Sequence, residues 1–272
     1  MSLENFNYSI LGSNTEKRIV FVHGLMSFSA NWRKIASRLE NEYQCLIYDQ
    51  RGHGKSFKPE TGYSPEIFAE DLHIITDELG WQNFNLVGHS MGARNAMVFA
   101  GLHPDKVKTL TIEDMGPDGD PKIINYYQRM FDAIPTPFNS RQQVQDFFAN
   151  DFGKVFNPSE SLQVLSLFLN SNIEEKPDGK FDWKFSKKAM LESVRLGNAR
   201  DYWAELKNFK MPVLLFRGET SHLLKLDTFN KMLEVNPKVQ GVQILGAGHW
   251  IHYEKYAEFT NYLREFLQLH NA

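Results

Sequence analysis

The chain of 272 residues has little cysteine, no excess of basic charge and no long apolar run. A single cysteine, Cys45, excludes an internal disulfide, and its apolar neighbours predict that it packs in the core. The formal net charge of -3 provides no basic field for nucleic acid or an anionic membrane surface. Without a run of 18 apolar residues, no membrane-spanning helix is expected. The first six residues lack the basic and apolar regions of a signal peptide, so a cytoplasmic protein is expected.

What the chain does have is apolar and aromatic residues, with 42% hydrophobic content and 21 phenylalanines. This length and content can bury a large core, either as one domain with an insertion or as two domains. The aromatic content exceeds what a sheet core alone usually needs, which suggests an additional apolar pocket.

Short apolar runs alternate with amphipathic helical patterns at both ends of the chain. The run 18–22 is rich in β-branched residues and is apolar from Ile19 onward, as is typical of a parallel strand covered on both faces. By the same criteria, strands are expected at 8–11, 45–48, 84–87, 107–112, 213–217 and 243–245, and helices at 31–39, 64–79, 96–102, 227–235 and 253–269. This alternation predicts an α/β fold with a mostly parallel central sheet flanked by helices.

The middle of the chain, residues 117–208, shows no clear strand pattern. Helices separated by prolines are expected there at 122–134, 142–152, 159–169 and 187–196. A helical block inserted in a β/α series predicts a cap over the sheet, with residues 1–116 and 209–272 forming the core. The aromatic residues of this block could line a substrate pocket or form the cap's own core: Tyr126, Phe131, Phe138, Phe147, Phe148, Phe152, Phe156, Phe168 and Trp203.

Ser90 lies in the most informative motif of the chain. An apolar run ends in Gly-x-Ser-x-Gly, and a helical pattern follows, which is the strand–turn–helix context of a nucleophile elbow. Gly88 and Gly92 lack Cβ atoms where the strand and the helix come close together. The turn exposes the Ser90 hydroxyl and leaves the Met91 N–H at a helix N-terminus, where developing negative charge is favoured.

A serine hydroxyl needs a base, and His249 is the best placed of the nine histidines. It follows the last expected strand, in a loop on the same sheet edge as the elbow. His89, inside the elbow, is expected to point away from the nucleophile. His23 is expected to pack beneath the neighbouring loop, and His53 to make structural hydrogen bonds.

These motifs together resemble the α/β-hydrolase superfamily over nearly the whole chain outside the cap. The matching segments are residues 23–24, 49–56, 88–92 and 248–249. The resemblance implies an α/β-hydrolase fold with a helical cap inserted after the strand that follows the elbow. It also implies an oxyanion hole formed by the N–H groups of Leu25 and Met91. It implies no cofactor and no metal.

The acidic partner of the histidine is not at the family's usual place, where this chain has Ser221. Asp114 ends the strand after the elbow helix, and the segment 113–117 resembles the Asp-x-x-Pro motif of small esterases of the YbfF-like group. This resemblance implies that Asp114 is the acid and that Ser221 is an auxiliary hydrogen-bonding residue. Asp114 could instead cap a helix of the cap domain, and Glu219 and Asp227 are competing acids.

The chemistry expected from these residues is hydrolysis of short-to-medium acyl esters through an acyl-enzyme. The chain would act on small molecules, as a monomer or homodimer, without inserting into a membrane. Thioesterase, carbon–carbon bond hydrolase, cofactor-free haloperoxidase and peptidase activities stay open, as does a non-catalytic ligand receptor on the same fold. A thioesterase acting on coenzyme A esters would favour a basic rim, which could come from Lys184, Lys187, Lys188, Arg195 and Arg200.

Overall fold

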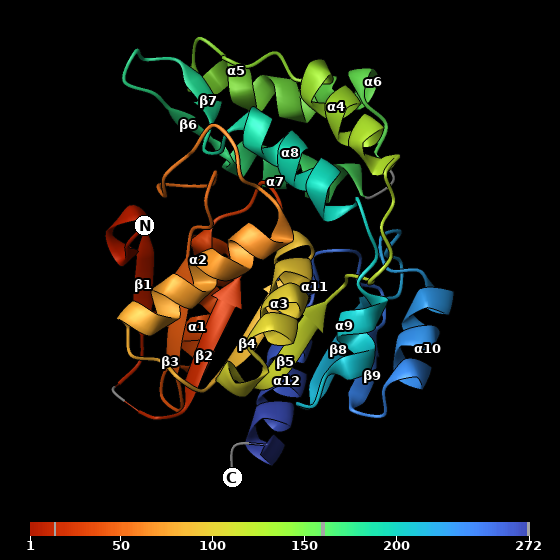
Figure 1. Ribbon diagram of the computed structural model, residues 1–272. Coiled ribbons are helices and arrows are strands. Elements are labelled where there is room, and N and C mark those ends of the chain that lie inside the picture. The colour runs from red at the N-terminus through yellow and green to blue at the C-terminus, as the bar shows by residue number, and fades with distance from the viewer. Residues whose placement is uncertain (14, 159–160, 271–272) are drawn as a thin grey trace.

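A seven-stranded sheet runs through the centre of the molecule in the computed structural model, which describes residues 1–13, 15–158 and 161–270 (Figure 1). The strand order is β1-β3-β2-β4-β5-β8-β9, and only β1 is antiparallel to its neighbour. The strands are β1 (Tyr8–Leu11), β2 (Arg18–Val22), β3 (Gln44–Tyr48), β4 (Phe84–His89), β5 (Val107–Glu113), β8 (Val213–Gly218) and β9 (Val239–Ile244). The expected α/β fold with a mostly parallel sheet is confirmed.

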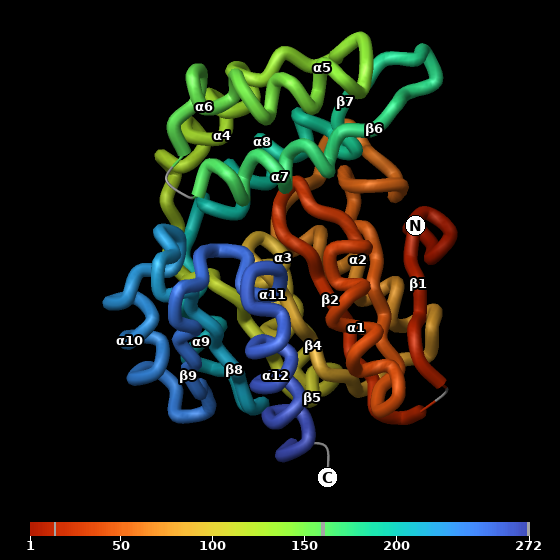
Figure 2. The backbone as a smooth tube through the Cα atoms, turned by 180° about the vertical axis from the view of Figure 1, so that it is seen from behind, coloured from red at the N-terminus to blue at the C-terminus, as the bar shows by residue number. Residues whose placement is uncertain are grey.

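Helices cover both faces of the sheet, so nearly every residue of its inner strands is buried. In β2, Ile19 and Phe21 pack toward one face, whereas Val20 and Val22 pack toward the other. The first face is covered by α1 (Arg33–Leu39), α11 (Ile251–Glu254) and α12 (Tyr256–His270), seen in front in Figure 2. The second face is covered by α2 (Pro65–Glu78), α3 (Met91–Leu102), α9 (Trp203–Asn208) and α10 (Leu226–Val235).

The segment between β5 and β8 rises above one end of the sheet, at the top of Figure 1. Its helices are α4 (Ile123–Ala133), α5 (Arg141–Asp146), α6 (Phe152–Val155), α7 (Leu162–Ser171) and α8 (Lys187–Gly197). The expected helix at 142–152 is interrupted by a π-helical turn at Phe147–Asp151. Of the helix expected at 159–169, residues 159 and 160 lie outside the described residues.

This segment also contains strands, contrary to the sequence-based expectation. β6 (Ile173–Glu175) and β7 (Phe181–Trp183) form an antiparallel hairpin. Each strand has three residues, too few for an alternating pattern to stand out in the sequence. The turn between them contains Pro177 and Gly179, whose φ of 79° suits glycine.

The chain leaves the core and returns to it at neighbouring points. The Tyr202 N–H donates to the Pro117 carbonyl oxygen at 2.8 Å, so the outgoing and incoming segments lie side by side. Helix α9 follows immediately and packs on α3. Tyr202 and Leu206 are buried in the apolar cluster between the second face of the sheet and its helices. The end of the segment 117–208 thus contacts the core rather than the helices above it.

Two boundaries near the C-terminus differ from expectation. β9 spans residues 239–244 instead of 243–245, because its alternating polar residues on the exposed side of an edge strand hide the apolar pattern. The expected helix at 253–269 is two helices, because Lys255 leaves the helical conformation with φ -130° and ψ 47°. In the described part of the chain, no helix is long and apolar enough to cross a membrane.

Candidate active site

Ser90 occupies a strained turn between β4 and α3. Its φ of 55° and ψ of -123° are unfavourable for a residue with a side chain. The turn is held by the Ser90 N–H, which donates to the Glu113 carbonyl oxygen at 3.0 Å. A Cβ atom on Gly88 would lie 2.6 Å from the backbone of Ala93, and one on Gly92 would lie 2.4 Å from the Val22 carbonyl oxygen. The two glycines of the motif are therefore sterically required.

Asp114 lies at the end of β5, fully buried and with a φ of 52°. Its Oδ1 accepts a hydrogen bond from the Gly218 N–H at 3.0 Å. Its Oδ2 accepts from His249 Nδ1 at 2.7 Å and also from the Ser221 hydroxyl. Three donors thus fix the position of this carboxylate. Asp114 caps no helix, because the next helix, α4, begins at Ile123.

The imidazole of His249 is oriented by this carboxylate. Because a carboxylate accepts hydrogen bonds, Nδ1 is the donor in this contact, and Nε2 is the ring nitrogen that makes no hydrogen bond to Asp114. The loop carrying His249 is fixed by His89, whose Nε2 donates to the His249 carbonyl oxygen at 3.0 Å. His89 thus supports the backbone of this loop.

The two competing acids lie elsewhere. Glu219 is exposed, and its Oε2 accepts the Gly246 N–H at 2.8 Å. Asp227 is exposed in the first turn of α10, whose N-cap residue is Lys225. Ser221, by contrast, is buried, and its Oγ also accepts the Leu223 N–H at 3.2 Å. Of the three acids considered, Asp114 is the one hydrogen-bonded to His249.

Two backbone N–H groups lie unused beside Ser90. Among the described residues, neither the Leu25 N–H nor the Met91 N–H has a hydrogen-bond acceptor. Met91 is the first residue of α3. The loop before Leu25 approaches Ser90 closely, since a Cβ atom on Gly24 would lie 3.3 Å from Ser90 Cβ. Leu25 and Met91 also line a cavity with Ser90. Free donors at a helix N-terminus favour an anion.

The remaining histidines of the loops make structural contacts. His23 Nδ1 donates to the Gly24 carbonyl oxygen at 2.8 Å, and its Nε2 accepts the Gln50 N–H at 3.0 Å. His53 Nδ1 donates to the Arg51 carbonyl oxygen at 2.9 Å. Burial lowers the pKa of both imidazoles. Both side chains are therefore neutral parts of the loops around the site.

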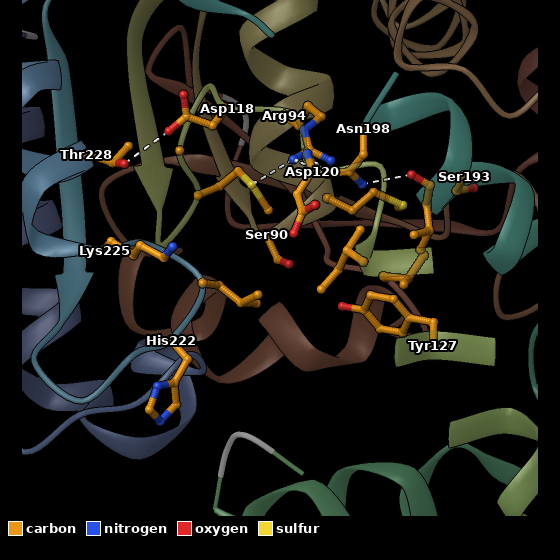
Figure 3. Close-up of a pocket in the computed structure, with 17 residues that line it drawn as sticks. Ser90, Arg94, Asp118, Asp120, Tyr127, Ser193, Asn198, His222, Lys225 and Thr228 are labelled. Atoms are coloured by element: carbon orange, nitrogen blue, oxygen red, sulfur yellow. Dashed lines mark hydrogen bonds between the residues drawn. The ribbon is translucent and has the colours of Figure 1, made fainter. Parts of the chain in front are cut away.

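Two cavities meet at Ser90. The larger, of about 260 Å³, is lined by Leu25, Met91, Arg94, Asp118, Asn198, Lys225 and others (Figure 3). The smaller, of about 20 Å³, lies on the His249 side, between Tyr126, Phe168 and Trp250. Ser90 therefore faces a larger, partly polar cavity on one side and a narrow apolar cavity on the other.

Most aromatic residues of the segment 117–208 pack against one another and do not line these cavities. Phe131, Phe138, Phe148, Phe152 and Phe156 are buried against one another and against neighbouring apolar residues. Of the nine aromatic residues considered, only Tyr126 and Phe168 line a cavity at Ser90, and Trp203 lies on α9. None of the five basic residues considered for a rim lines either cavity.

Glu113 and His252, close in sequence to Asp114 and His249, form a second acid–histidine pair. No sequence motif marks this pair. Glu113 is fully buried, and its carboxylate accepts the His252 Nδ1 proton at 2.9 Å and the His252 N–H at 2.8 Å. The His252 ring stacks on Trp32 at 4.4 Å, and the His89 ring lies 4.9 Å away. His89, Glu113 and His252 each offer one possible metal-ligand atom, and these three atoms lie within 4.8 Å of one another. Their ligand atoms are engaged in hydrogen bonds within the protein, which favours a structural role.

Arg94 is a further polar residue at the site that the motifs did not single out. It lies four residues after Ser90 in α3 and lines the larger cavity. Residues at this spacing share one side of a helix, so the sequence position itself could have indicated it.

Comparison with known proteins identifies the family of the chain. Residues 17–256 match the family model of the alpha/beta hydrolase fold. A 2-(acetamidomethylene)succinate hydrolase of Mesorhizobium japonicum is 28% identical, with 86% of this chain and 81% of that protein covered. Esterase YbfF of Escherichia coli is 24% identical, with 92% of each chain covered. The structure of a marine microorganism esterase superposes with a TM-score of 0.81 at 27% identity, covering 96% of this chain and 98% of that one.

The chain belongs to the α/β-hydrolase family, as the match over most of its length shows. It is an enzyme of the hydrolase class, and it resembles the serine esterases of the YbfF-like group.

Proposed function

We propose that the protein hydrolyses carboxylic esters through an acyl-enzyme, with Ser90 as nucleophile, His249 as base and Asp114 as acid. The observation that carries this proposal is the 2.7 Å hydrogen bond between Asp114 Oδ2 and His249 Nδ1, in a cavity wall shared with Ser90. A buried carboxylate stabilises the imidazolium that forms when the histidine takes the serine proton. Ser221 acts as an auxiliary donor that holds the Asp114 carboxylate in place.

The proposed reaction is an acyl transfer in two halves. Ser90 Oγ forms a bond to the ester carbonyl carbon while its proton passes to His249 Nε2. The N–H groups of Leu25 and Met91 stabilise the oxyanion, which collapses as the bond to the alcohol oxygen breaks. His249 donates its proton to the departing alcohol. Water then repeats these steps on the acyl-enzyme and releases the acid.

The cavity dimensions support short-to-medium acyl chains. The larger cavity, of about 260 Å³, is small for a ligand site, since pockets for drug-sized ligands begin at about 300 Å³. Its upper wall comes from α4 and α8, which contribute Ile123, Tyr127, Ser193 and Val194. We accordingly propose that the inserted segment is a cap that limits substrate size. We place its end before α9, at about residue 202, because α9 packs on the core.

The test is hydrolysis of ethyl esters from acetate to dodecanoate by the wild type and by Ser90→Ala. The wild type should show its maximum below about twelve carbons. Ser90→Ala should lose on the order of 10⁶-fold in kcat, because no other group in the proposed mechanism can form the acyl-enzyme. Ser193→Ala is a matched control, because this serine lines the same cavity but donates to the Ala189 carbonyl oxygen at 2.8 Å.

Two results would contradict the proposal. A Ser90→Ala protein that retained ester hydrolysis would exclude Ser90 as nucleophile. A wild type that cleaved none of the esters and did not react with a fluorophosphonate would favour a non-catalytic ligand receptor.

A further inference from the structure

Arg94 carries a buried positive charge into the wall of the larger cavity. Only 6% of its surface is exposed, and it lines the cavity together with Ser90 (Figure 3). Taking a guanidinium out of water costs several kcal/mol unless an anion or a full set of acceptors replaces the solvent. The hydrogen-bond partners of Arg94 therefore indicate whether the protein itself offsets this loss of hydration.

The protein supplies Arg94 with no anion. Its Nη2 contacts Met115 Sδ at 3.4 Å and Asn198 Oδ1 at 3.2 Å, and both are uncharged acceptors. Its Nε is buried without a partner among the described residues. No acidic side chain of the described chain comes within 4.0 Å of the guanidinium. Burial lowers the pKa of Arg94, yet a guanidinium stays protonated in proteins.

The two aspartates of the same cavity are exposed and have other partners. Asp118 accepts from Trp203 Nε1 at 2.8 Å and from the Thr228 hydroxyl at 3.0 Å. Asp120 accepts the Lys122 N–H at 3.0 Å. Arg51 provides the contrast within this chain, because its buried guanidinium makes two hydrogen bonds to the carboxylate of Asp71. The fold thus pairs Arg51 with a carboxylate and leaves Arg94 without one.

The positions of the two cavities on either side of Ser90 indicate which part of the substrate lies near Arg94. In the proposed mechanism His249 protonates the departing alcohol, so the alcohol lies in the narrow space beside His249. The acyl group then lies in the larger cavity, where Arg94 is. The exposed amine of Lys225 at the same cavity adds a second positive charge.

We propose that Arg94 binds a carboxylate on the acyl part of the substrate, so that the preferred substrates are half-esters of small dicarboxylic acids with a small alcohol. This inference rests on the proposed ester hydrolysis and defines its substrate class. A carboxylate matches the fork of N–H donors in a guanidinium and supplies the missing counter-charge. The products are the dicarboxylic acid and the alcohol, with one water consumed.

The experiment compares two esters that differ in charge but hardly in shape. Monoethyl succinate carries a carboxylate, and ethyl succinamate carries a neutral amide at the same position. The wild type should favour the succinate by roughly 30-fold or more in kcat/KM, mainly through KM. In Arg94→Met this ratio should fall close to one. In Lys225→Met, which removes the exposed charge of the same cavity, most of the ratio should persist.

The outcomes separate this inference from the proposed function. A wild type that cleaves both esters equally overturns the role of Arg94 and leaves the esterase proposal intact. An Arg94→Met protein that slows both esters by the same factor also overturns it, because that is the result of a structural role.

Binding without turnover provides an independent measurement. Calorimetric titration of Ser90→Ala with monoethyl succinate should give a dissociation constant at least about 30-fold lower than with ethyl succinamate. Equal affinities would overturn the inference even if Arg94→Met did not fold. The preference of the Ser90→Ala protein does not depend on its being an esterase, so a failure of the proposed function would be recognised separately.

Discussion

At the scale of single residues, Asp114 has a backbone conformation with positive φ and a carboxylate that accepts three hydrogen bonds. Its φ of 52° is tolerated by aspartate and asparagine better than by most residues. Its two oxygens receive hydrogen bonds from Gly218, Ser221 and His249. Substitution by asparagine therefore keeps the backbone conformation and nearly the same shape while removing the negative charge.

We predict that Asp114→Asn lowers kcat for ester hydrolysis by on the order of 10⁴-fold with little loss of folding stability. The neutral amide cannot stabilise an imidazolium, and its NH2 group can force the wrong tautomer on His249. Steady-state kinetics on a short-chain ethyl ester measures the effect. Ser221→Ala is the control, and should cost about tenfold or less because it removes one hydrogen bond and no charge. An Asp114→Asn enzyme within tenfold of the wild type would mean that another group supplies the acid.

At the scale of elements, the contact between α3 and β2 depends on one glycine. A Cβ atom on Gly92 would lie 2.4 Å from the carbonyl oxygens of both Val22 and His23, and backbone atoms cannot move aside as side chains can. We predict that Gly92→Ala lowers the free energy of unfolding by roughly 3 kcal/mol, measured by urea denaturation.

The matched control lies in the same helix. A Cβ atom on Gly101 would meet only the flexible side chain of Glu205, at 3.2 Å. Gly101→Ala should leave stability unchanged or raise it by up to about 1 kcal/mol, because alanine favours the helix. Equal effects of the two substitutions would show that helix propensity, and not the close approach to β2, decides the outcome.

Elements also show what could and could not be predicted from the sequence. Continuous apolar runs such as 19–22 identify the inner strands because both faces of these strands are buried. The edge strand β9 and the hairpin β6–β7 were missed or shortened, since an exposed face and a length of three residues remove the pattern. Ser90, His249 and Asp114 could be placed on one sheet edge because each follows a strand. Glu113 and His252 could not, because their importance comes from burial and from a pairing between residues distant in the sequence.

At the scale of the whole molecule, buried neutral histidines make stability depend on pH. Burial, and repulsion from other histidines, holds the pKa of His53 and of His89 well below the ordinary value of 6.5. In the unfolded chain both titrate near that value. As the pH falls below about 6.5, these histidines bind protons in the unfolded state but not in the folded state. The folded state therefore loses stability relative to the unfolded state.

We predict that the free energy of unfolding falls by up to about 3 kcal/mol between pH 7.5 and pH 5.5 through these two groups. Urea denaturation at both pH values measures the drop. His53→Gln, which can still donate to the Arg51 carbonyl oxygen, should remove about half of it. If the variant and the wild type lost the same stability, the pH dependence would have to come from other groups.

The hydrogen bond between Tyr202 and Pro117 closes the base of the inserted segment, so the chain enters and leaves the core at nearly one point. An insertion attached in this way can change in length or sequence without separating β5 from β8, its neighbour in the sheet. Ser90, Asp114 and His249 all lie outside it. The segment is thus an exchangeable module: if the proposed function holds, a different insertion grafted between residues 117 and 202 would give the same core a new range of substrates.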